Sequence, residues 1–224
     1  MDRLINWHKE PCARITGNRG LDQFKVQAPG VVKLSPGGGF RLFYTAVGPD
    51  KPFADCQGYI LSAVSDNGRD FEPEPGIRVA PDPERQELSL RALAPSITSI
   101  AGGWRMYYEG RGPADQPTVI ASAVSKDLLH WEVEPGVRVG GRMGFGAPRF
   151  LQLSGDTGRL YLFRRNTGPP RANEVVSALT TDGLSFEIEP GVRMPSCTGT
   201  VDSAGLTAGE VVPPDSSSDP WTLI

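Results

Sequence analysis

Histidine and cysteine are scarce in this sequence, and neither sign of charge dominates it. The 224 residues include two histidines (His8 and His130) and three cysteines (Cys12, Cys56 and Cys197). The cysteines are odd in number, far apart and without C-x-x-C spacing, which argues against a disulfide framework or a zinc site. A net charge of −3 is too mild to indicate nucleic acid or an anionic membrane as a partner. We therefore predict no cofactor and no metal.

The sequence also lacks long apolar runs and helical periodicity. No window reaches the length of a membrane span, and the first residues contain no apolar core of a signal peptide. Apolar residues nowhere recur with the spacing of an amphipathic helix. These absences favour a cytoplasmic protein with no membrane contact and few or no helices.

Glycine and proline, by contrast, are abundant. The chain has 27 glycines and 21 prolines, and they recur at intervals between short runs of β-branched and aromatic residues. This pattern is typical of many tight turns between short strands. We expect an all-β protein.

One segment type repeats along the chain. Residues 65–79, 125–139 and 180–194 each contain an aromatic residue followed, at a fixed offset, by Glu-Pro-Gly-x-Arg. A fourth copy lies at residues 7–15, where Cys12 replaces the glycine. We interpret the motif as structural: it shapes an outer strand, its Glu and Arg are local partners, and its aromatic residue packs between repeats.

Three strands precede each full copy of the motif. We predict them at residues 28–32, 40–46 and 58–64, then 94–98, 104–110 and 118–124, then 147–151, 159–165 and 174–179. With the motif strand, each unit is a four-stranded antiparallel meander, which is the blade of a β-propeller.

The repeat length sets the predicted organisation. Residues 1–224 form a single propeller domain, with full blades at 27–80, 94–141 and 147–196. Residues 4–17 are the outer strand of a closing blade, and residues 203–224 begin a further blade. A ring of five blades needs more residues than this, so we expect the propeller to be incomplete at its C-terminal side.

The blade sequences resemble a known group of propellers. The pattern x-Ala-Pro-x-Val, then Phe-Arg-Leu-Phe-Tyr-Thr-Ala (40–46) or Trp-Arg-Met-Tyr-Tyr-Glu-Gly (104–110), then the Glu-Pro-Gly motif, is similar to the five-bladed arabinanase/levansucrase/invertase superfamily. The resemblance implies a glycoside-hydrolase-like protein with an active site where the innermost strands begin. Three carboxylates act there in such enzymes. At the matching positions this chain has Ala28, Ala94 or Ser96, and Gly146.

Other acids are candidates for the missing carboxylates. Glycoside cleavage needs one carboxylate as base or nucleophile and one carboxylic acid, separated by roughly 5–9.5 Å. Asp22, Glu109 and Asp202 lie near the beginnings of inner strands or at the end of a second strand. The alternative is that Asp22 and Asp202 are turn residues and that Glu109 forms a local ion pair with Arg111.

Arginine and tyrosine residues recur at the same places along the repeats. Arginine forks and aromatic faces are suited to a polyhydroxylated or anionic sugar. The candidate substrate-binding residues are Tyr44, Arg91, Tyr108, Arg111, Arg149 and Arg164, with Arg165 beside the last. The alternative is that strand alternation turns about half of them away and buries Tyr107 or Tyr108 in the core.

Two hypotheses follow. In the first, the protein is a possible glycosidase that uses displaced carboxylates at the mouth of the propeller channel on a small sugar or glycoside. In the second, it is a catalytically inactive propeller that binds carbohydrate or another ligand. Fold similarity favours the first hypothesis, and the vacated acid positions favour the second.

Overall fold

The structure is a computed structural model, and nearly all of its regular structure is strand. It describes residues 9–17, 20–34, 37–48, 56–165 and 172–197, and also 199, 203, 205–207, 209–212, 214 and 221–223. Asp202 and Trp7 lie outside these residues. The only helices described are two 3₁₀ turns, η1 (Gly20–Asp22) and η3 (Gln86–Leu88). No helix among the described residues has the length and apolarity needed to cross a membrane.

The strands form three similar groups of four and one pair. The first group is β1 (Lys25–Lys33), β2 (Phe40–Val47), β3 (Gly58–Ser65) and β4 (Glu72–Pro73). The second is β5 (Arg91–Ile100), β6 (Gly103–Arg111), β7 (Val119–Ser125) and β8 (Glu132–Val133). The third is β9 (Phe145–Ser154), β10 (Thr157–Arg164), β11 (Glu174–Thr180) and β12 (Glu187–Ile188). The pair is β13 (Val211–Val212) with β14 (Thr222–Leu223).

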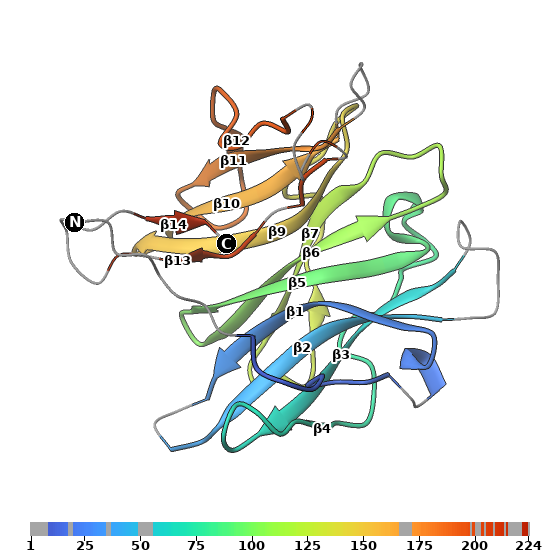
Figure 1. The fold of residues 1–224 in the computed structure, drawn as a ribbon. Helices are drawn as coiled ribbons and strands as arrows, with labels where there is room; N and C mark the ends of the chain where they lie inside the picture. Colours follow the sequence, from blue (N-terminus) through green and yellow to red (C-terminus); the bar gives the residue numbers. More distant parts are fainter. Residues whose placement is uncertain are drawn as a thin grey trace.

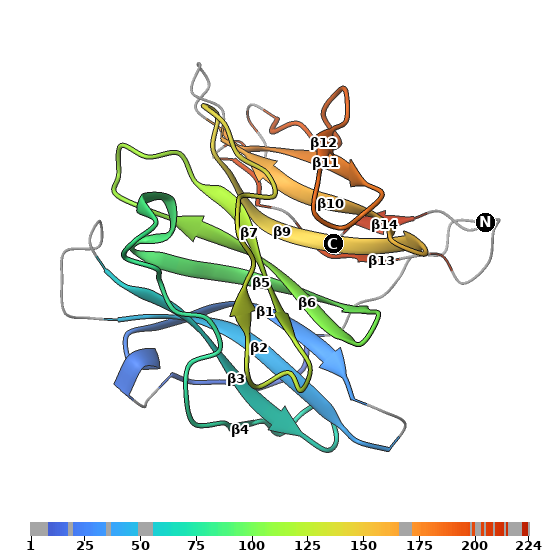
Figure 2. The same cartoon turned by 180° about the vertical axis from the view of Figure 1, so that it is seen from behind.

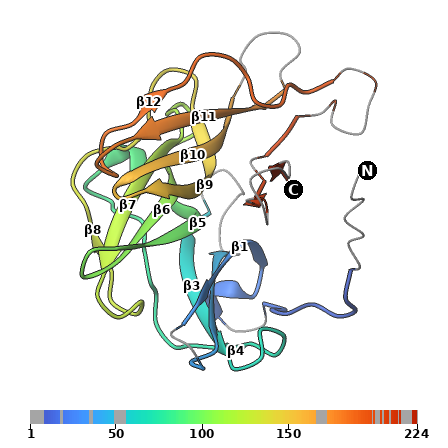
Figure 3. The same cartoon turned by 90° about the vertical axis from the view of Figure 1, so that its left-hand side faces the viewer.

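Each group of four is an antiparallel meander, as the sequence predicts. Neighbouring strands pair in chain order within each group, and one parallel pair, Gly58 with Arg91, links β3 to β5. The three meanders follow one another side by side in both views of the broad face (Figures 1 and 2). Seen from the side, β1, β5 and β9 face a common centre while β4, β8 and β12 lie at the periphery (Figure 3). The meanders are therefore propeller blades, with β1, β5 and β9 innermost.

Apolar side chains fill the space between successive blades. Phe43 of the first blade meets Trp131 of the second with ring centroids 5.7 Å apart and edge-to-face. Tyr107 of the second blade meets Phe186 of the third in the same way at 5.5 Å. Trp131 and Phe186 are the aromatic residues that begin the repeated motif. Their contacts lie between blades, as predicted, and such pairs stabilise beyond the area that they bury.

The glutamate of each motif anchors a repeated set of hydrogen bonds. In the first blade Glu74 accepts from Arg41 at 2.8 and 2.9 Å and from Ser62 Oγ at 2.7 Å. Arg78 donates to the same Ser62 Oγ at 2.7 Å and to the Pro75 carbonyl at 2.8 Å. Glu134 and Glu189 have the same arginine and serine partners in their blades, which are Arg105, Ser122, Arg159 and Ser177. We call this set the repeat network.

The repeat network adds a partner that the sequence analysis does not name. Each motif glutamate pairs with an arginine of the second strand. In the first and third blades the motif arginine donates from Nε to the network serine, whereas Arg138 Nε of the second blade has no hydrogen-bond partner among the described residues. Burial alone would raise the pKa of Glu74, but the hydrogen bonds from Arg41 and Ser62 outweigh it and lower the pKa. The glutamate is thus held as a carboxylate.

The N-terminal copy of the motif shares one backbone feature with the others. Gly76, Gly136 and Gly191 have φ of +89°, +80° and +87°, a region that glycine enters without strain. Cys12 stands at the same motif position with φ of +69°. A side chain is rarely tolerated there, so the N-terminal copy shares this turn conformation. The structure assigns no strand to residues 9–17, within the outer strand predicted at 4–17.

Candidate active site

The beginnings of the innermost strands share an unusual backbone feature. Ala28, Ala94 and Ala147 have φ of +51°, +50° and +47°, and a proline follows each. The strand pairing shifts register at each of these points, which identifies a β-bulge. An alanine at positive φ before proline costs of order 1–3 kcal/mol, and such strain is concentrated at functional sites.

The three bulges meet in one apolar cluster. Its members come from all three blades and are Val47, Cys56, Leu93, Ala94, Ala147 and Phe163, with Ala28 packed against them. We call this the mouth cluster, because it lies where inner strands begin and second strands end. The convergence of the three alanines is what a propeller requires. It also places small apolar side chains where the resemblance would have carboxylates.

Side chains of the preceding blade hold two of the bulges. Thr45 Oγ1 accepts a hydrogen bond of 2.8 Å from the backbone N–H of Ala94. Glu109 Oε2 accepts one of 2.9 Å from the backbone N–H of Ala147. Thr45 and Glu109 are equivalent residues of β2 and β6, so a threonine in one blade and a glutamate in the next do the same structural task.

Glu109 also fills the space that Gly146 leaves. A Cβ placed on Gly146 would lie 2.3 Å from Glu109 Oε2 and 2.4 Å from Phe163 Cζ. Gly146 is a position where the resemblance would have a glutamate. The carboxylate of Glu109, which comes from the preceding blade, therefore lies where the Cβ of a side chain at position 146 would be.

Arg111 completes this arrangement. Its Nε donates to Glu109 Oε1, which is the ion pair weighed in the sequence analysis. Glu109 is 3% exposed, whereas the side chain of Arg111 is 29% exposed. The terminal nitrogens of its guanidinium make no hydrogen bond to a residue that the structure describes, so they are the donors that the pair leaves for a ligand. Glu109 and Arg111 are predicted site residues that the structure brings into direct contact.

Asp22 and Tyr44 lie together elsewhere. The Tyr44 hydroxyl donates to Asp22 Oδ2 at 3.1 Å, and both residues are buried. Tyr44 belongs to the apolar face of the first blade that turns away from the second blade, whereas its neighbour Thr45 reaches Ala94 of the second blade. Asp22 and Glu109 are therefore separated by the first blade's sheet and do not face one cleft. Asp202, the third candidate acid, lies outside the described residues.

Arg149 reaches across the centre of the ring. Its Nη2 donates to the Pro29 carbonyl of β1 at 3.4 Å, and its Nε lies 3.4 Å from Glu210 Oε2. Burial lowers the pKa of Arg149, and the charge of Glu210 partly offsets this. Arg149 thus joins β9 to the first blade and to the segment that precedes β13.

The remaining candidates for sugar binding have structural partners. Arg91 is 5% exposed and donates to the Cys56 carbonyl at 2.8 Å, opposite Arg111 in the β5–β6 register. Arg164 pairs with Glu174 across β10 and β11. Tyr108 is 2% exposed in the core between the first two blades, and burial raises its pKa to about 12. The structure places Arg91 and Arg164 at the mouth end and Tyr108 inside.

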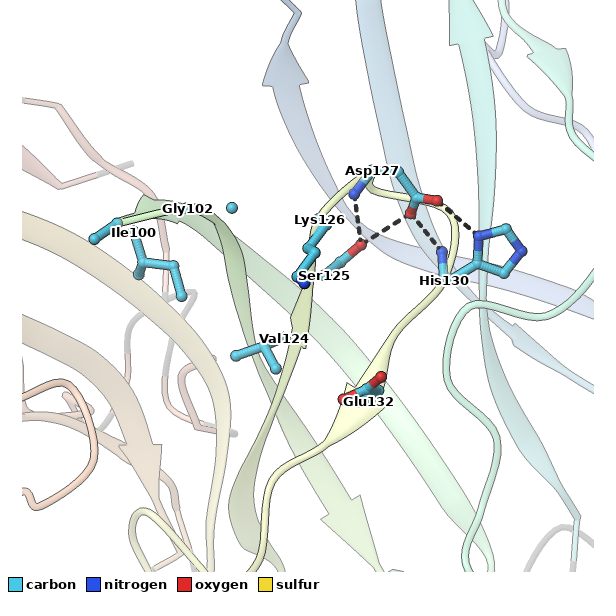
Figure 4. A pocket seen from close by; sticks show the side chains of 10 residues that line it. Ile100, Gly102, Val124, Ser125, Lys126, Asp127, His130 and Glu132 are labelled. Atoms are coloured by element: carbon cyan, nitrogen blue, oxygen red, sulfur yellow. Dashed lines mark hydrogen bonds and ion pairs between the residues drawn. The ribbon is translucent and has the colours of Figure 1, made fainter.

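A surface cleft at the opposite end of the second blade recurs in every blade. Figure 4 shows its turn, where Asp127 accepts a hydrogen bond from the backbone N–H of His130 and pairs with His130 Nδ1 at 2.7 Å. Asp127 also accepts from the backbone N–H of Leu129. Equivalent clefts lie at residues 64–72 and 179–187. Because the cleft repeats with the blade, it is a consequence of blade geometry and not a feature peculiar to one site.

Thr45 and Phe163 are site residues that no sequence motif indicated. Both belong to the mouth region, and both are equivalent to Glu109 in their own blades. A residue-by-residue alignment of the second strands would have shown that this position is threonine in the first blade, glutamate in the second and phenylalanine in the third.

Comparison with solved structures bears on the fold. A mannoside phosphorylase-family structure (the GH130 family, whose glycoside hydrolases target β-1,2-mannosidic linkages in Candida mannan) has a TM-score of 0.67 and 16% identity, over 83% of this chain and 56% of that one. The fold is that of the five-bladed glycoside hydrolase propellers. A β-1,2-mannobiose phosphorylase from Listeria innocua, solved with β-1,2-mannobiose, gives 0.67 at 12% identity over 87% of this chain and 65% of that one. A family 117 glycoside hydrolase from Zobellia galactanivorans gives 0.62 at 17% identity, over 80% and 60%.

The propeller fold is shared at low sequence identity. No family model and no curated protein matches this chain. The chain spans 56%, 60% and 65% of the length of these three solved propellers. The likeness therefore concerns the blade architecture, and the activity has to be argued from this chain's own residues.

Proposed function

We propose that this glycoside-hydrolase-like propeller binds a carbohydrate at the channel mouth, with the Glu109–Arg111 pair as its polar contact. The observation that carries the proposal is the placement of Glu109. Its carboxylate takes the space that Gly146 vacates, and it fixes Arg111 beside the strained bulge of Ala147. A guanidinium held in this way is a pre-organised set of donors for sugar hydroxyls.

The geometry supports binding more than hydrolysis. Cleavage of a glycosidic bond needs two carboxyl groups across one cleft. Glu109 is committed to Ala147 N–H and Arg111, and Asp22 lies on the other face of the first blade. Asp202 is the candidate that hydrolysis would need as the second carboxyl group. We propose a small sugar as the partner, and not a nucleic acid or a membrane.

We also propose a cytoplasmic location for the protein. None of Cys12, Cys56 and Cys197 is in a disulfide, which suits a reducing compartment.

The test measures binding and cleavage together. Calorimetric titration with neutral oligosaccharides, among them β-1,2-mannobiose, is run beside a panel of aryl glycosides on the wild type, Arg111→Ala and Glu109→Gln. We expect sugar binding that weakens about tenfold or more in Arg111→Ala, since a hydrogen bond to a charged group contributes about 1.5–3 kcal/mol. We expect no aryl-glycoside hydrolysis above the background rate.

Glu109→Gln tests whether Glu109 positions Arg111 or acts as a catalytic carboxylate. The glutamine keeps an oxygen for the Ala147 N–H and removes the charge, so the bulge should persist. Hydrolysis in the wild type that is lost in both Glu109→Gln and Asp202→Asn would establish a glycosidase and overturn the binding proposal. Arg69→Ala, which changes an exposed arginine at the far end of the first blade, is the control.

A further inference from the structure

At the channel mouth, an arginine of the second blade has a carboxylate partner, whereas the equivalent arginine of the third blade has none. Arg111 and Arg165 are equivalent residues: Arg111 is the last residue of β6, and Arg165 follows the last residue of β10. Arg111 finds its carboxylate two residues earlier, in Glu109. At the matching position before Arg165 the third blade has Phe163, which packs in the mouth cluster.

Arg165 is therefore a cation without its local carboxylate. It is exposed, and its guanidinium has no hydrogen bond or ion pair with any residue that the structure describes. Its neighbour Arg164 pairs with Glu174 and so leaves no acid of β11 for it. A guanidinium with no compensating charge among the described residues favours an anionic group.

A second arginine belongs to the same part of the rim. The backbone N–H of Arg165 donates to the Gly144 carbonyl at 3.0 Å, which fixes β10's end against the loop 140–144. Arg142, two residues before Gly144, is exposed and likewise has no side-chain partner among the described residues. Two uncompensated arginines thus stand on adjoining segments of the third blade.

We infer that Arg165 and Arg142 form a subsite for a negatively charged substituent, so that the carbohydrate taken at the mouth is an acidic sugar carrying a carboxylate or a sulfate. This inference rests on the proposed function, because it names the substrate class of the same site. In this proposal Arg111, whose charge Glu109 neutralises, binds sugar hydroxyl groups. Arg165 and Arg142 bind the carboxylate or sulfate of the sugar.

The experiment titrates the full chain with β-1,2-mannobiose, digalacturonate, a sulfated galactan disaccharide and inorganic sulfate. The proteins are the wild type, Arg142→Ala, Arg165→Ala and the control Arg69→Ala. We expect an acidic sugar to bind at least tenfold more tightly than mannobiose, and the preference to shrink as salt screens the charges. Arg165→Ala should weaken acidic-sugar binding about ten- to hundredfold and leave mannobiose binding unchanged. The carboxylate and sulfate arms show which anion is preferred.

The outcomes separate this inference from the function on which it rests. Equal affinity for neutral and acidic sugars, or an acidic preference that survives Arg165→Ala and Arg142→Ala, overturns the charged subsite and leaves sugar binding intact. No binding of any sugar, with inorganic sulfate still bound in an Arg165-dependent way, overturns the carbohydrate proposal and supports the anion site. Circular dichroism on each variant confirms that the blades remain folded.

Discussion

The repeat network and the channel mouth differ in how strictly they repeat. Glu74, Glu134 and Glu189 each accept from an arginine and a serine at nearly the same distances in all three blades. At the mouth, the equivalent residues Thr45, Glu109 and Phe163 are polar, acidic and aromatic in turn. An interaction that recurs in every blade is explained by the blade itself. A position at which the residue type changes from blade to blade needs another explanation, and Thr45, Glu109 and Phe163 occupy such a position near the beginnings of the inner strands.

The largest effect is expected when one arginine of the repeat network is removed. Arg41→Ala leaves the carboxylate of Glu74, which is 15% exposed, with Ser62 as its remaining close donor. We expect a loss of about 3 kcal/mol in the free energy of unfolding, because a largely buried carboxylate loses its paired cation. Urea unfolding at neutral pH measures it.

A pH series and a matched variant test the same network. The pKa of Glu74 is lowered in the folded state, so its stabilisation is present above the ordinary value of about 4.5 and is lost as pH falls through the lowered value. The difference between wild type and Arg41→Ala should therefore shrink in acid. Arg159→Ala, whose ion pair is more exposed at 30% and 22%, should cost less. Equal losses in both variants would contradict the role of burial.

The second prediction concerns the mouth, where the sequence departs from its own repeat. Gly146→Ala forces a methyl group against Glu109 Oε2 and Phe163 Cζ, and overpacking of this kind costs about 1–3 kcal/mol. We expect a loss near 2 kcal/mol in urea unfolding. Glu109→Ala in the same chain should recover part of it, which a double-mutant cycle measures. A Gly146→Ala protein as stable as the wild type would mean that the carboxylate does not fill this space.

The blade architecture could be read from the sequence because it repeats. Regular glycine and proline turns and the Glu-Pro-Gly-x-Arg motif fixed the second and third strands to within two residues of those in the structure. The inner strands begin two or three residues earlier than predicted, since the bulge alanines lie inside the strands.

The candidate site could not be read in the same way. A propeller blade is buried on both faces, so Phe43, Tyr44 and Thr45 are all buried and no alternation of polarity shows which way each points. For that reason the sequence could not place Tyr44 on the face of the first blade that turns away from the second blade, or Tyr108 in the core between these two blades. It also could not show that Glu109 of one blade fills the space at Gly146 of the next, because this depends on packing between blades.

The smallest effect on stability is expected at Cys12, where the motif keeps its backbone conformation but not its glycine. Cys12 holds φ of +69° at a position where the other copies have glycine. Cys12→Gly removes a strain of about 1–2 kcal/mol, and the greater freedom of glycine in the unfolded chain offsets part of that gain. We expect a net stabilisation of about 0.5–1 kcal/mol in urea unfolding. Cys12→Ala keeps the Cβ and should leave stability unchanged, so equal stabilisation by both variants would trace the effect to the exposed thiol and not to the backbone conformation that this segment shares with the full blades.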